Sequence, residues 1–256
     1  MKGEQAKTVK TQEQKHSMFI SFVLPAYNEE ESIPELLARI TNSMKTIAAD
    51  YELVFVIEGT DNSVDVIDEF KKAHPDLKIK VFYEREPRGI MNAFKLGFEK
   101  VSPEATHVVT MDVDLNHYPE ELPRLIEKAK EGYNIVIGSR AIAGAKRLKV
   151  PFLKTILSKF SNFVFDKAFD IKVKDKSSGY RMFDAATIKE IAPLVQAKSF
   201  EGLMEILLIA ANRKKTFAEV PITMIFRKYG ESKVKLIPVG KGYLRLLLRR
   251  KDIRAR

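Results

Sequence analysis

Short apolar runs alternate with helix-length segments along the first half of this chain, and this alternation is what most constrains its fold. The apolar runs predict buried strands, and the spacing of apolar residues between them predicts helices. Repeated strand–helix order over residues 19–138 is typical of a parallel, doubly wound α/β sheet. The predicted strands are residues 19–24, 53–57, 77–83, 107–111 and 134–138, and the predicted helices include 89–101 and 200–212.

Three unusual polar segments follow strand ends in this pattern, at residues 25–29, 58–63 and 112–116. In a doubly wound sheet the ligand lies across the carboxyl ends of the strands. We therefore expect these three segments to converge on one crevice. The later half is less regular, and there we expect a long amphipathic helix, a polar loop and an extended segment over residues 152–170, 171–183 and 217–226.

Two carboxylates one residue apart, Asp112 and Asp114, come directly after the predicted strand 107–111. Such a pair can hold a hard divalent cation, which in turn can hold phosphates. Asn116 adds a neutral oxygen ligand, and an oxygen-only set suits Mg²⁺ or Mn²⁺. The alternative is that these acids cap the helix that begins near Pro119.

The segment after the first strand contains a rigid proline, Pro25, and an aromatic residue, Tyr27. These side chains can form a wall against a nucleobase or ribose, and Glu29 can accept hydrogen bonds from sugar hydroxyls. The alternative is an ordinary loop before a helix that is capped by the Ser-x-x-Glu box of residues 32–35. Glu58, at the end of the second strand, can accept an N–H from a base edge or remain a solvated loop acid.

Five motifs in order make the sequence resemble the family 2 glycosyltransferases. Each motif alone is weak, but their order along one chain is specific. The resemblance covers roughly residues 19–235, and it is strongest to the dolichyl-phosphate (polyprenyl-phosphate) mannosyl- or glucosyltransferases. The motifs are Pro-Ala-Tyr-Asn-Glu-Glu at residues 25–30, Asp-Val-Asp-Leu-Asn-His at 112–117, Gly-Ser-Arg at 138–140, Ser-Gly-Tyr-Arg at 178–181 and Tyr-Gly-Glu-Ser-Lys at 229–233.

This resemblance implies a GT-A fold, which is Rossmann-like and mostly parallel, and an inverting, metal-dependent transfer from a nucleotide-sugar donor. The implied ligands of Mg²⁺ or Mn²⁺ are Asp112, Asp114 and Asn116. The implied catalytic residues are Asp114, Arg140 and Arg181, and the implied acceptor-phosphate site is Arg140, Ser178 and Arg181. The implied donor-binding residues are Pro25, Tyr27, Glu29, Val56, Glu58, Asp112, Val113, Asp114, Arg227 and Lys233.

The chain departs from the family pattern at the second motif, where Ile57-Glu58-Gly59-Thr60 stands in place of the usual Asp-Asp-Gly-Ser. This change leaves the identity of the base open. Val113 replaces the usual small alanine between the two metal-binding acids. A phosphate acceptor is already anionic at neutral pH, so its attack needs no strong general base, and Arg140 and Arg181 can hold its charge.

Basic residues outnumber acidic ones by 44 to 34, and the net charge of +10 suits an anionic lipid surface or a phosphorylated substrate. The basic, amphipathic tail over 236–256 and the segment 152–170 are predicted to contact a membrane surface, unless both simply pack on the sheet. No apolar run approaches the about 18 residues that a spanning helix needs. We therefore expect peripheral association, at the cytoplasmic face of the membrane.

The chain has no cysteine, which excludes disulfides, thiolate catalysis and zinc–thiolate sites. Residues 1–18 are polar and predict a disordered N-terminal extension ahead of a catalytic domain over 19–235.

The favoured function is transfer of a hexose to dolichyl or polyprenyl phosphate, with mannose from GDP-mannose ahead of glucose from UDP-glucose. The alternative is a GT-A transferase that acts on a saccharide or lipid-linked sugar and needs a carboxylate base, for which Glu201 or Glu205 could serve. A basic nucleic-acid-binding module comes last because the sequence has no reading motif or aromatic platform, so we expect no nucleic-acid partner. His117, beside the predicted site, is expected to be structural.

Overall fold

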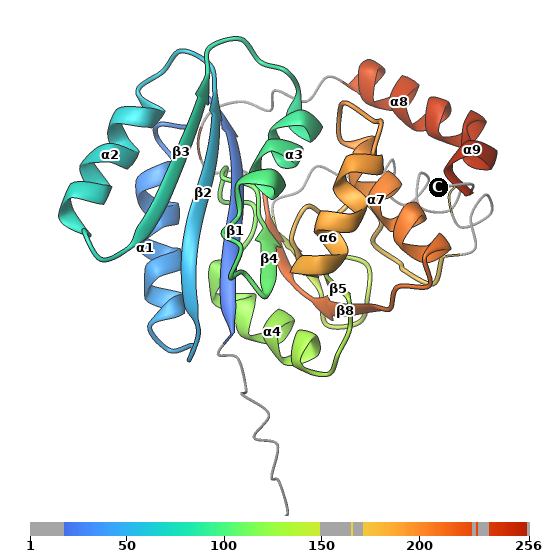
Figure 1. The fold of residues 1–256 in the computed structure, drawn as a ribbon, viewed down its shortest axis with the longest axis horizontal. Helices are drawn as coiled ribbons and strands as arrows, with labels where there is room; N and C mark the ends of the chain where they lie inside the picture. Colours follow the sequence, from blue (N-terminus) through green and yellow to red (C-terminus); the bar gives the residue numbers. More distant parts are fainter. Residues whose placement is uncertain (1–17, 149–164, 166–170, 227–228, 230–235, 255–256) are drawn as a thin grey trace, which may run out of the picture.

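The structure is a computed structural model that describes residues 18–148, 165, 171–226, 229 and 236–254 (Figure 1). The predicted N-terminal extension and, apart from Phe165, the predicted helix over 152–170 lie outside these residues, except that Met18 is described. The strands are β1 (Phe19–Tyr27), β2 (Asp50–Glu58), β3 (Lys78–Glu84), β4 (His107–Thr110), β5 (Ile135–Ser139), β6 (Lys146–Leu148), β7 (Arg181–Asp184), β8 (Phe217–Pro221) and β9 (Thr223–Ile225). The helices are α1 (Ile33–Met44), α2 (Ser63–Ala73), α3 (Ile90–Lys100), α4 (Leu122–Lys130), α6 (Ala185–Ile191), α7 (Glu201–Asn212), α8 (Leu236–Leu248) and α9 (Arg250–Arg254), with short 3-10 turns at Pro119–Glu121 and Ala192–Leu194.

Seven strands form the central sheet in the order β3-β2-β1-β4-β7-β5-β8 (Figure 1). The first four strands in this order are parallel to one another, and β5 is parallel to β8. Only β7 runs antiparallel to its neighbours, β4 and β5. The sheet is therefore mostly parallel, which confirms the predicted fold class.

Strand β7 corrects the prediction of a polar loop over residues 171–183. A charged residue stands at each end of this four-residue strand, Arg181 and Asp184, and this hid the buried apolar pair between them in the sequence. The strand matters for function because its antiparallel pairing brings Arg181 opposite Thr110, at the carboxyl end of β4.

Two apolar cores cover the two faces of the sheet. Successive residues of a strand point to opposite faces, so Phe22 packs in the core with α1, α2 and α4, whereas Val23 packs with α3, α6 and α7. Helix α3 comes especially close to the sheet at Gly97, where a Cβ would lie 2.2 Å from a methyl carbon of Val23. Because both faces are covered, the carboxyl edge of the sheet is where the polar loops gather.

A second, two-stranded sheet lies at this edge. It pairs β6 with β9 in parallel, so the extended segment predicted over 217–226 is two short strands, β8 and β9. The amide of Ile225 donates to the carbonyl of Asn116 over 3.1 Å, and Met224 forms a β-bridge with His117. The small sheet is therefore hydrogen-bonded to the segment that follows β4.

The C-terminal helices α8 and α9 pack against α7 (Figure 1). Leu246 and Ile253 are buried in the same core as α7, whereas Leu244 and Leu248 are exposed. The C-terminal helices therefore pack on α7 through one side only. Within the described part of the chain, no helix is both long and apolar enough to cross a lipid bilayer.

Candidate active site

The three polar segments meet at the carboxyl edge of the sheet, as the alternation of strands and helices predicted. The parallel register pairs Tyr27 at the end of β1 with Glu58 at the end of β2. The register between β1 and β4 pairs Val23 with Thr110, two residues before Asp112. The ends of β1, β2 and β4 are therefore neighbours, and one ligand could touch all three.

The loops after β1 and β2 interlock. Asn28 has a left-handed φ of +51°, and its Oδ1 accepts a hydrogen bond from the Thr60 amide at 2.8 Å. Glu30 Oε2 accepts one from the Asn62 amide, also at 2.8 Å. Gly59 has a φ of +111°, and a Cβ there would lie 1.9 Å from Asn28 Oδ1, so this contact requires glycine. The loops after β1 and β2 therefore hold each other in place and form a fixed platform at this edge of the sheet.

The predicted wall for a nucleobase is only partly present. Tyr27 is 39 % exposed, but Pro25 is buried within β1 and offers no surface. The capping box of residues 32–35 is wrong, because Ser32 makes no side-chain cap bond. Its hydroxyl instead donates to the backbone carbonyl and to Oε2 of Glu29, both at 3.1 Å. The Ser32 hydroxyl therefore fixes the orientation of the Glu29 side chain.

The two residues predicted to meet the base differ in their placement. Val56 is 1 % exposed, so its side chain has no surface to offer a base. Glu58 is also buried, and its Oε1 accepts a hydrogen bond from the Arg88 amide at 2.9 Å. The Arg88 guanidinium pairs with Glu84 at 2.9 Å. Glu58 therefore holds the turn that carries Arg88, a residue at this edge that the sequence reasoning missed.

The Asp-Val-Asp segment turns tightly after β4. Leu115 has a left-handed φ of +63°, and the Asn116 side chain donates to Asp114 Oδ2 at 2.7 Å. Val113 is buried, so any donor contact there would come from its backbone. A Cβ on Gly179 would lie 3.0 Å from Asp112 Oδ1, which shows how closely the next loop approaches this carboxylate.

The alternative in which these acids cap the following helix is wrong. The 3-10 turn over Pro119–Glu121 and helix α4 both begin without a side-chain cap bond. The two carboxylates remain at the crevice.

These residues fit a divalent cation. Asn116 Oδ1 is buried and, among the described residues, accepts no hydrogen bond, as expected of an oxygen meant for another ligand. No cluster of three or more acidic or histidine side chains suited to a metal occurs in the described part of the chain. Mg²⁺ is commonly held by one or two carboxylates together with substrate phosphates and water, so Asp112, Asp114 and Asn116 suffice.

His117 is structural, as expected. It is buried, its ring stacks on Tyr180 with centroids 5.3 Å apart, and its Nδ1 faces the Asp112 amide at 3.4 Å. Burial, together with the nearby charge of Arg140, lowers the pKa of His117 to about 4. The ring is therefore neutral at pH 7, and its 3.8 Å approach to the Asp112 carboxylate is not an ion pair.

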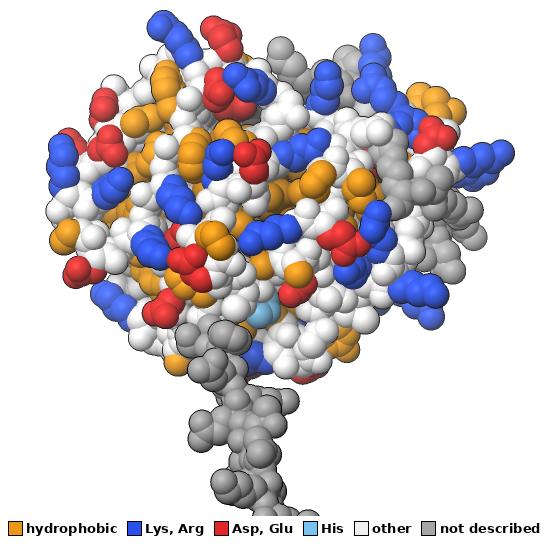
Figure 2. Space-filling view, viewed as in Figure 1, with side chains coloured by type: hydrophobic (Ala, Val, Ile, Leu, Met, Phe, Trp, Pro, Cys, Tyr) orange, Lys and Arg blue, Asp and Glu red, His pale blue; other side chains and the backbone are white. Residues whose placement is uncertain are grey.

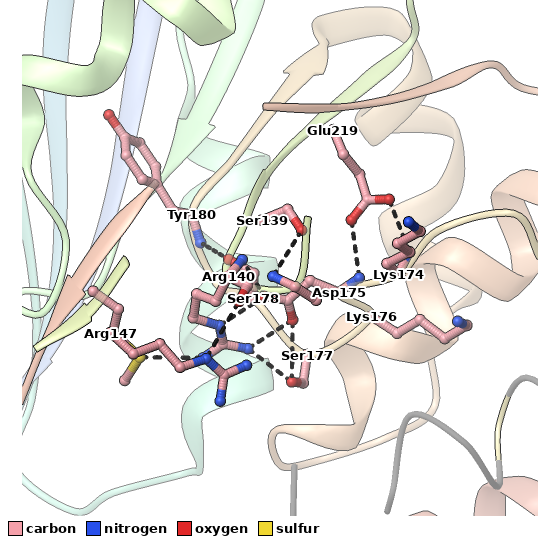
Figure 3. Close-up of polar contacts among 12 residues, drawn as sticks. Ser139, Arg140, Arg147, Lys174, Asp175, Lys176, Ser177, Ser178, Tyr180 and Glu219 are labelled. Carbon is pink, nitrogen blue, oxygen red and sulfur yellow. Dashed lines mark hydrogen bonds and ion pairs between the residues drawn. The ribbon is translucent and has the colours of Figure 1, made fainter. Parts of the chain in front are cut away.

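Arg140 forms a buried ion pair with Asp175 (Figure 3). Asp175 accepts hydrogen bonds from the Arg140 amide at 2.8 Å and from Nε and Nη2 at 2.7 Å each. Ser177 accepts another from Nη2 at 2.8 Å. Burial opposes the charge of Asp175, but the Arg140 guanidinium outweighs burial and lowers the pKa of Asp175 to about 2. Asp175 was not predicted from the sequence.

The loop before β7 is held by a second arginine. Arg181 is fully buried and donates to the carbonyls of Ser178 and Lys176 at 2.8 Å each and of Leu203 at 2.5 Å. Burial lowers the pKa of Arg181 to about 10. Ser178 is buried as well, and its hydroxyl accepts from the Tyr180 amide. The predicted contact of Ser178 and Arg181 with an acceptor phosphate is not supported, because neither side chain has exposed surface.

The two candidate base residues lie on α7. Glu205 is fully buried, and its Oε2 accepts from the amides of Gln196 and Ala197 at 3.0 and 2.7 Å. It holds the loop before α7 rather than serving as a base. Glu201 is also buried, but its Oε2 has no hydrogen-bond partner among the described residues. Of the two, Glu201 is the one with a buried oxygen that accepts no hydrogen bond from the described residues.

Arg227 and Lys233 lie outside the described residues. Tyr229, between them in sequence, places its hydroxyl 3.3 Å from Glu35 Oε2 on α1.

The class of protein follows from what this edge can bind. Asp112 and Asp114 can hold a cation with phosphates, Tyr27 can support a flat ring, and Arg140 marks a basic region beside them. A sugar nucleotide contains both phosphates, which a cation can hold, and a flat base, which Tyr27 can support. The mostly parallel sheet is that of a GT-A glycosyltransferase. Residues 21–192 match the model of glycosyl transferase family 2, and the chain belongs to this family.

Curated relatives include proteins that act on lipid phosphates. The chain is 36 % identical to the dolichol-phosphate mannosyltransferase of Pyrococcus furiosus, over 85 % of this chain and 60 % of that protein. It is 31 % identical to the undecaprenyl-phosphate 4-deoxy-4-formamido-L-arabinose transferase of Shewanella sediminis, over 84 % of this chain and 61 % of that protein. The chain thus spans about three fifths of the length of these relatives.

Solved structures include glucosyl-3-phosphoglycerate synthase from Mycobacterium tuberculosis in complex with Mn²⁺, UDP and phosphoglyceric acid. The TM-score is 0.66 at 19 % identity, covering 93 % of this chain and 78 % of that one. The same synthase with Mg²⁺ and UDP gives a TM-score of 0.64 at 18 % identity, covering 93 % and 79 %. At these identities the similarity establishes the fold.

Proposed function

We propose that the protein transfers a hexose from a nucleotide sugar to a polyprenyl or dolichyl phosphate, with mannose from GDP-mannose ahead of glucose from UDP-glucose. The observation that carries this proposal is the short separation between the predicted cation site and the basic Arg140. Arg140 Nη1 lies 3.8 Å from the sulfur of Met224, which forms the β-bridge with His117, and Asp112 is among the charges that act on Arg140, so a basic group stands beside the predicted cation site. The lipid-phosphate activities named for the curated relatives support the same acceptor.

The chain's own residues would hold the donor. Asp112, Asp114 and Asn116 would bind Mg²⁺ or Mn²⁺, and a bound cation would stabilise the charge of the departing nucleoside diphosphate. Tyr27 would support the base or ribose, and Glu29, oriented by Ser32, would accept hydrogen bonds from sugar hydroxyls. The interlocked loops keep these groups in place, which limits the reorganisation needed on binding.

The acceptor requires little proton transfer. A phosphate monoester carries its negative charge at neutral pH, so the protein has only to orient it and balance its charge. The commitment of Glu205 to backbone amides is consistent with such an acceptor. A second candidate function is transfer to a sugar hydroxyl. The observation that favours it is the buried Glu201 Oε2, which has no hydrogen-bond partner in the part of the chain that the structure describes.

Helix α8 would bring the enzyme to its lipid. Leu244 and Leu248 are 58 % and 77 % exposed, and exposed Lys241 and Arg245 flank them. Figure 2 shows hydrophobic and basic side chains together over α8 and α9. Apolar residues beside cations are typical of helices that lie in an anionic membrane surface. We place this peripheral contact at the cytoplasmic face of the membrane.

The inner side of the same helix faces the Arg140–Asp175 pair. Burial raises the pKa of Tyr243, and the nearby Arg140 partly opposes this rise, which puts Tyr243 within electrostatic range of the arginine. A surface-bound α8 would therefore hold the crevice near the lipid headgroups. Flotation with anionic vesicles tests this contact: the double variant Leu244→Ser/Leu248→Ser should float less than the parent, and equal flotation would contradict it.

Radiolabel transfer tests the proposed reaction. Labelled GDP-mannose and, separately, UDP-glucose would be incubated with a polyprenyl phosphate and Mg²⁺ or Mn²⁺. We expect label in the organic phase, reduced on the order of 100-fold or more by Asp114→Asn. Asp68→Asn, which removes an exposed acid of α2, is the matched control and should transfer normally. No label in the lipid with either donor would contradict the proposal.

A further inference from the structure

Arg147 on β6 is a half-buried cation that forms no ion pair with a carboxylate among the described residues. Its Nε donates to the carbonyl of Arg140 at 3.3 Å. Among the described residues, no acid lies within ion-pair distance of its guanidinium, and Nη1 and Nη2 make no hydrogen bond. Long basic side chains that are exposed need no partner, but one held halfway into the protein loses hydration and is expected to find one.

Arg140 and Arg147 both lie near one fully buried carboxylate, Asp175, and Arg140 is also within electrostatic range of Asp112. The Asp175 carboxylate is bonded to the Arg140 amide, Nε and Nη2, so its oxygens are committed to Arg140 (Figure 3). Burial and the charge of Arg140 lower the pKa of Arg147, and Asp175 only partly offsets them. The Arg147 guanidinium is therefore only weakly compensated by the described carboxylates, and like charges side by side favour binding of an anion.

Strand pairing places Arg147 near the predicted cation site. Arg147 pairs with Met224 across the small sheet, and Met224 forms the β-bridge with His117. Neighbouring strands lie about 4.8 Å apart, so the backbone of Arg147 is roughly 10 Å from that of His117. The sulfur of Met224 also lies 3.8 Å from Arg140 Nη1. The guanidinium of Arg147 thus lies at the crevice, on the side where Arg140 pairs with Asp175.

We propose that Arg147 is the side chain that binds the phosphate monoester of the acceptor, and that Arg140 is a positioning residue held by Asp175. Nη1 and Nη2 form a planar fork, which matches two oxygens of a phosphate monoester. This inference rests on the proposed function, because it names the acceptor contact of the same crevice. It also replaces the contact that was predicted for Ser178 and Arg181, which are buried.

The test compares Arg147→Gln and Arg147→Lys with a matched control, Lys146→Gln, which removes an exposed cation one residue away. Losing a charge-assisted, bidentate contact should raise KM for a short-chain isoprenyl phosphate roughly 10- to 100-fold in Arg147→Gln. Arg147→Lys should lie between Arg147→Gln and the parent, since it keeps the charge without the fork. KM for the nucleotide sugar and the melting temperature should stay unchanged, and Lys146→Gln should behave as the parent.

Calorimetric binding separates this inference from the proposed function. Isoprenyl phosphate should bind the parent protein and lose roughly 10-fold or more in affinity in Arg147→Gln. Competition by inorganic phosphate would show whether the phosphate group alone is recognised, and full retention of that competition in Arg147→Gln would overturn the assignment. An unchanged acceptor KM, or a rise in the donor KM instead, would also overturn it. If the parent transferred no sugar but still bound isoprenyl phosphate in a way that depends on Arg147, the proposed reaction would be rejected and the phosphate-binding role of Arg147 would stand.

Discussion

Removing the charge of Asp175 should destabilise the protein strongly, although the residue lies in a Lys-rich loop. Asp175→Asn keeps an oxygen that can accept from the Arg140 amide, but it leaves the Arg140 guanidinium without its carboxylate. In the native structure that carboxylate is fully buried and binds Arg140 Nε and Nη2 at 2.7 Å each. The substitution therefore tests the ion pair rather than the shape of the loop.

Two arguments give the expected loss of unfolding free energy in Asp175→Asn. The ordinary pKa of aspartate is 3.8 and that of Asp175 is about 2, a difference that corresponds to about 2–3 kcal/mol. Breaking a buried pair by removing one partner costs about 3–5 kcal/mol. We expect the free energy of unfolding to fall by about 2.5–5 kcal/mol, or roughly 5–20 °C in Tm for a chain of this size.

Chemical denaturation at several pH values is the assay. The pKa of Asp175 is depressed in the folded state, so its contribution is complete above about pH 4 and is lost as pH falls towards 2. The difference between parent and Asp175→Asn should therefore be full at pH 6 and shrink at pH 3. Glu131→Gln, which breaks an exposed pair with Lys128, is the control and should change stability by about 0.5 kcal/mol or less. A difference below about 1 kcal/mol at pH 6, or one that does not shrink on acidification, would refute the reasoning.

Three further substitutions test the rest of the site. Gly59→Ala should lower Tm and raise the donor KM, because its Cβ would lie 1.9 Å from Asn28 Oδ1 at a φ of +111°; an unchanged donor KM would contradict the platform. Asn116→Ala should weaken Mn²⁺ activation roughly 10-fold in a metal titration, because it removes a buried ligand oxygen, and an unchanged titration curve would exclude this ligand. Gly179→Ala should raise the metal requirement through its 3.0 Å approach to Asp112. Gly240→Ala, where a Cβ would meet nothing within 4 Å, is the control for activity.

The sequence predicted the parts of the fold that depend on local apolar patterns. Strands β1 to β5 and the convergence of their polar ends follow from apolar runs and parallel order. Strand β7 did not, because Arg181 and Asp184 at its ends give it a polar pattern, and only tertiary carbonyl acceptors make a buried arginine tolerable there. Tertiary context overrides local pattern at such a position.

The candidate site was predicted less completely, for a related reason. Asp112 and Asp114 stand out because acids rarely follow a core strand. Asp175 and Arg147 do not, because their roles depend on Arg140, 35 and 7 residues away in the chain. The capping box failed because Glu29, rather than the expected cap, captured the hydroxyl of the serine at position 32.

The central claim is that a sugar is transferred to a phosphate oxygen, and ³¹P NMR of the acceptor tests it most directly. The protein would be incubated with polyprenyl phosphate, GDP-mannose or UDP-glucose, and Mg²⁺. We predict that the monoester resonance of the lipid gives way to a diester resonance as nucleoside diphosphate appears in equal amount. Release of nucleoside diphosphate with transfer of the hexose to a sugar acceptor, while the lipid monoester stays unchanged, would contradict the account.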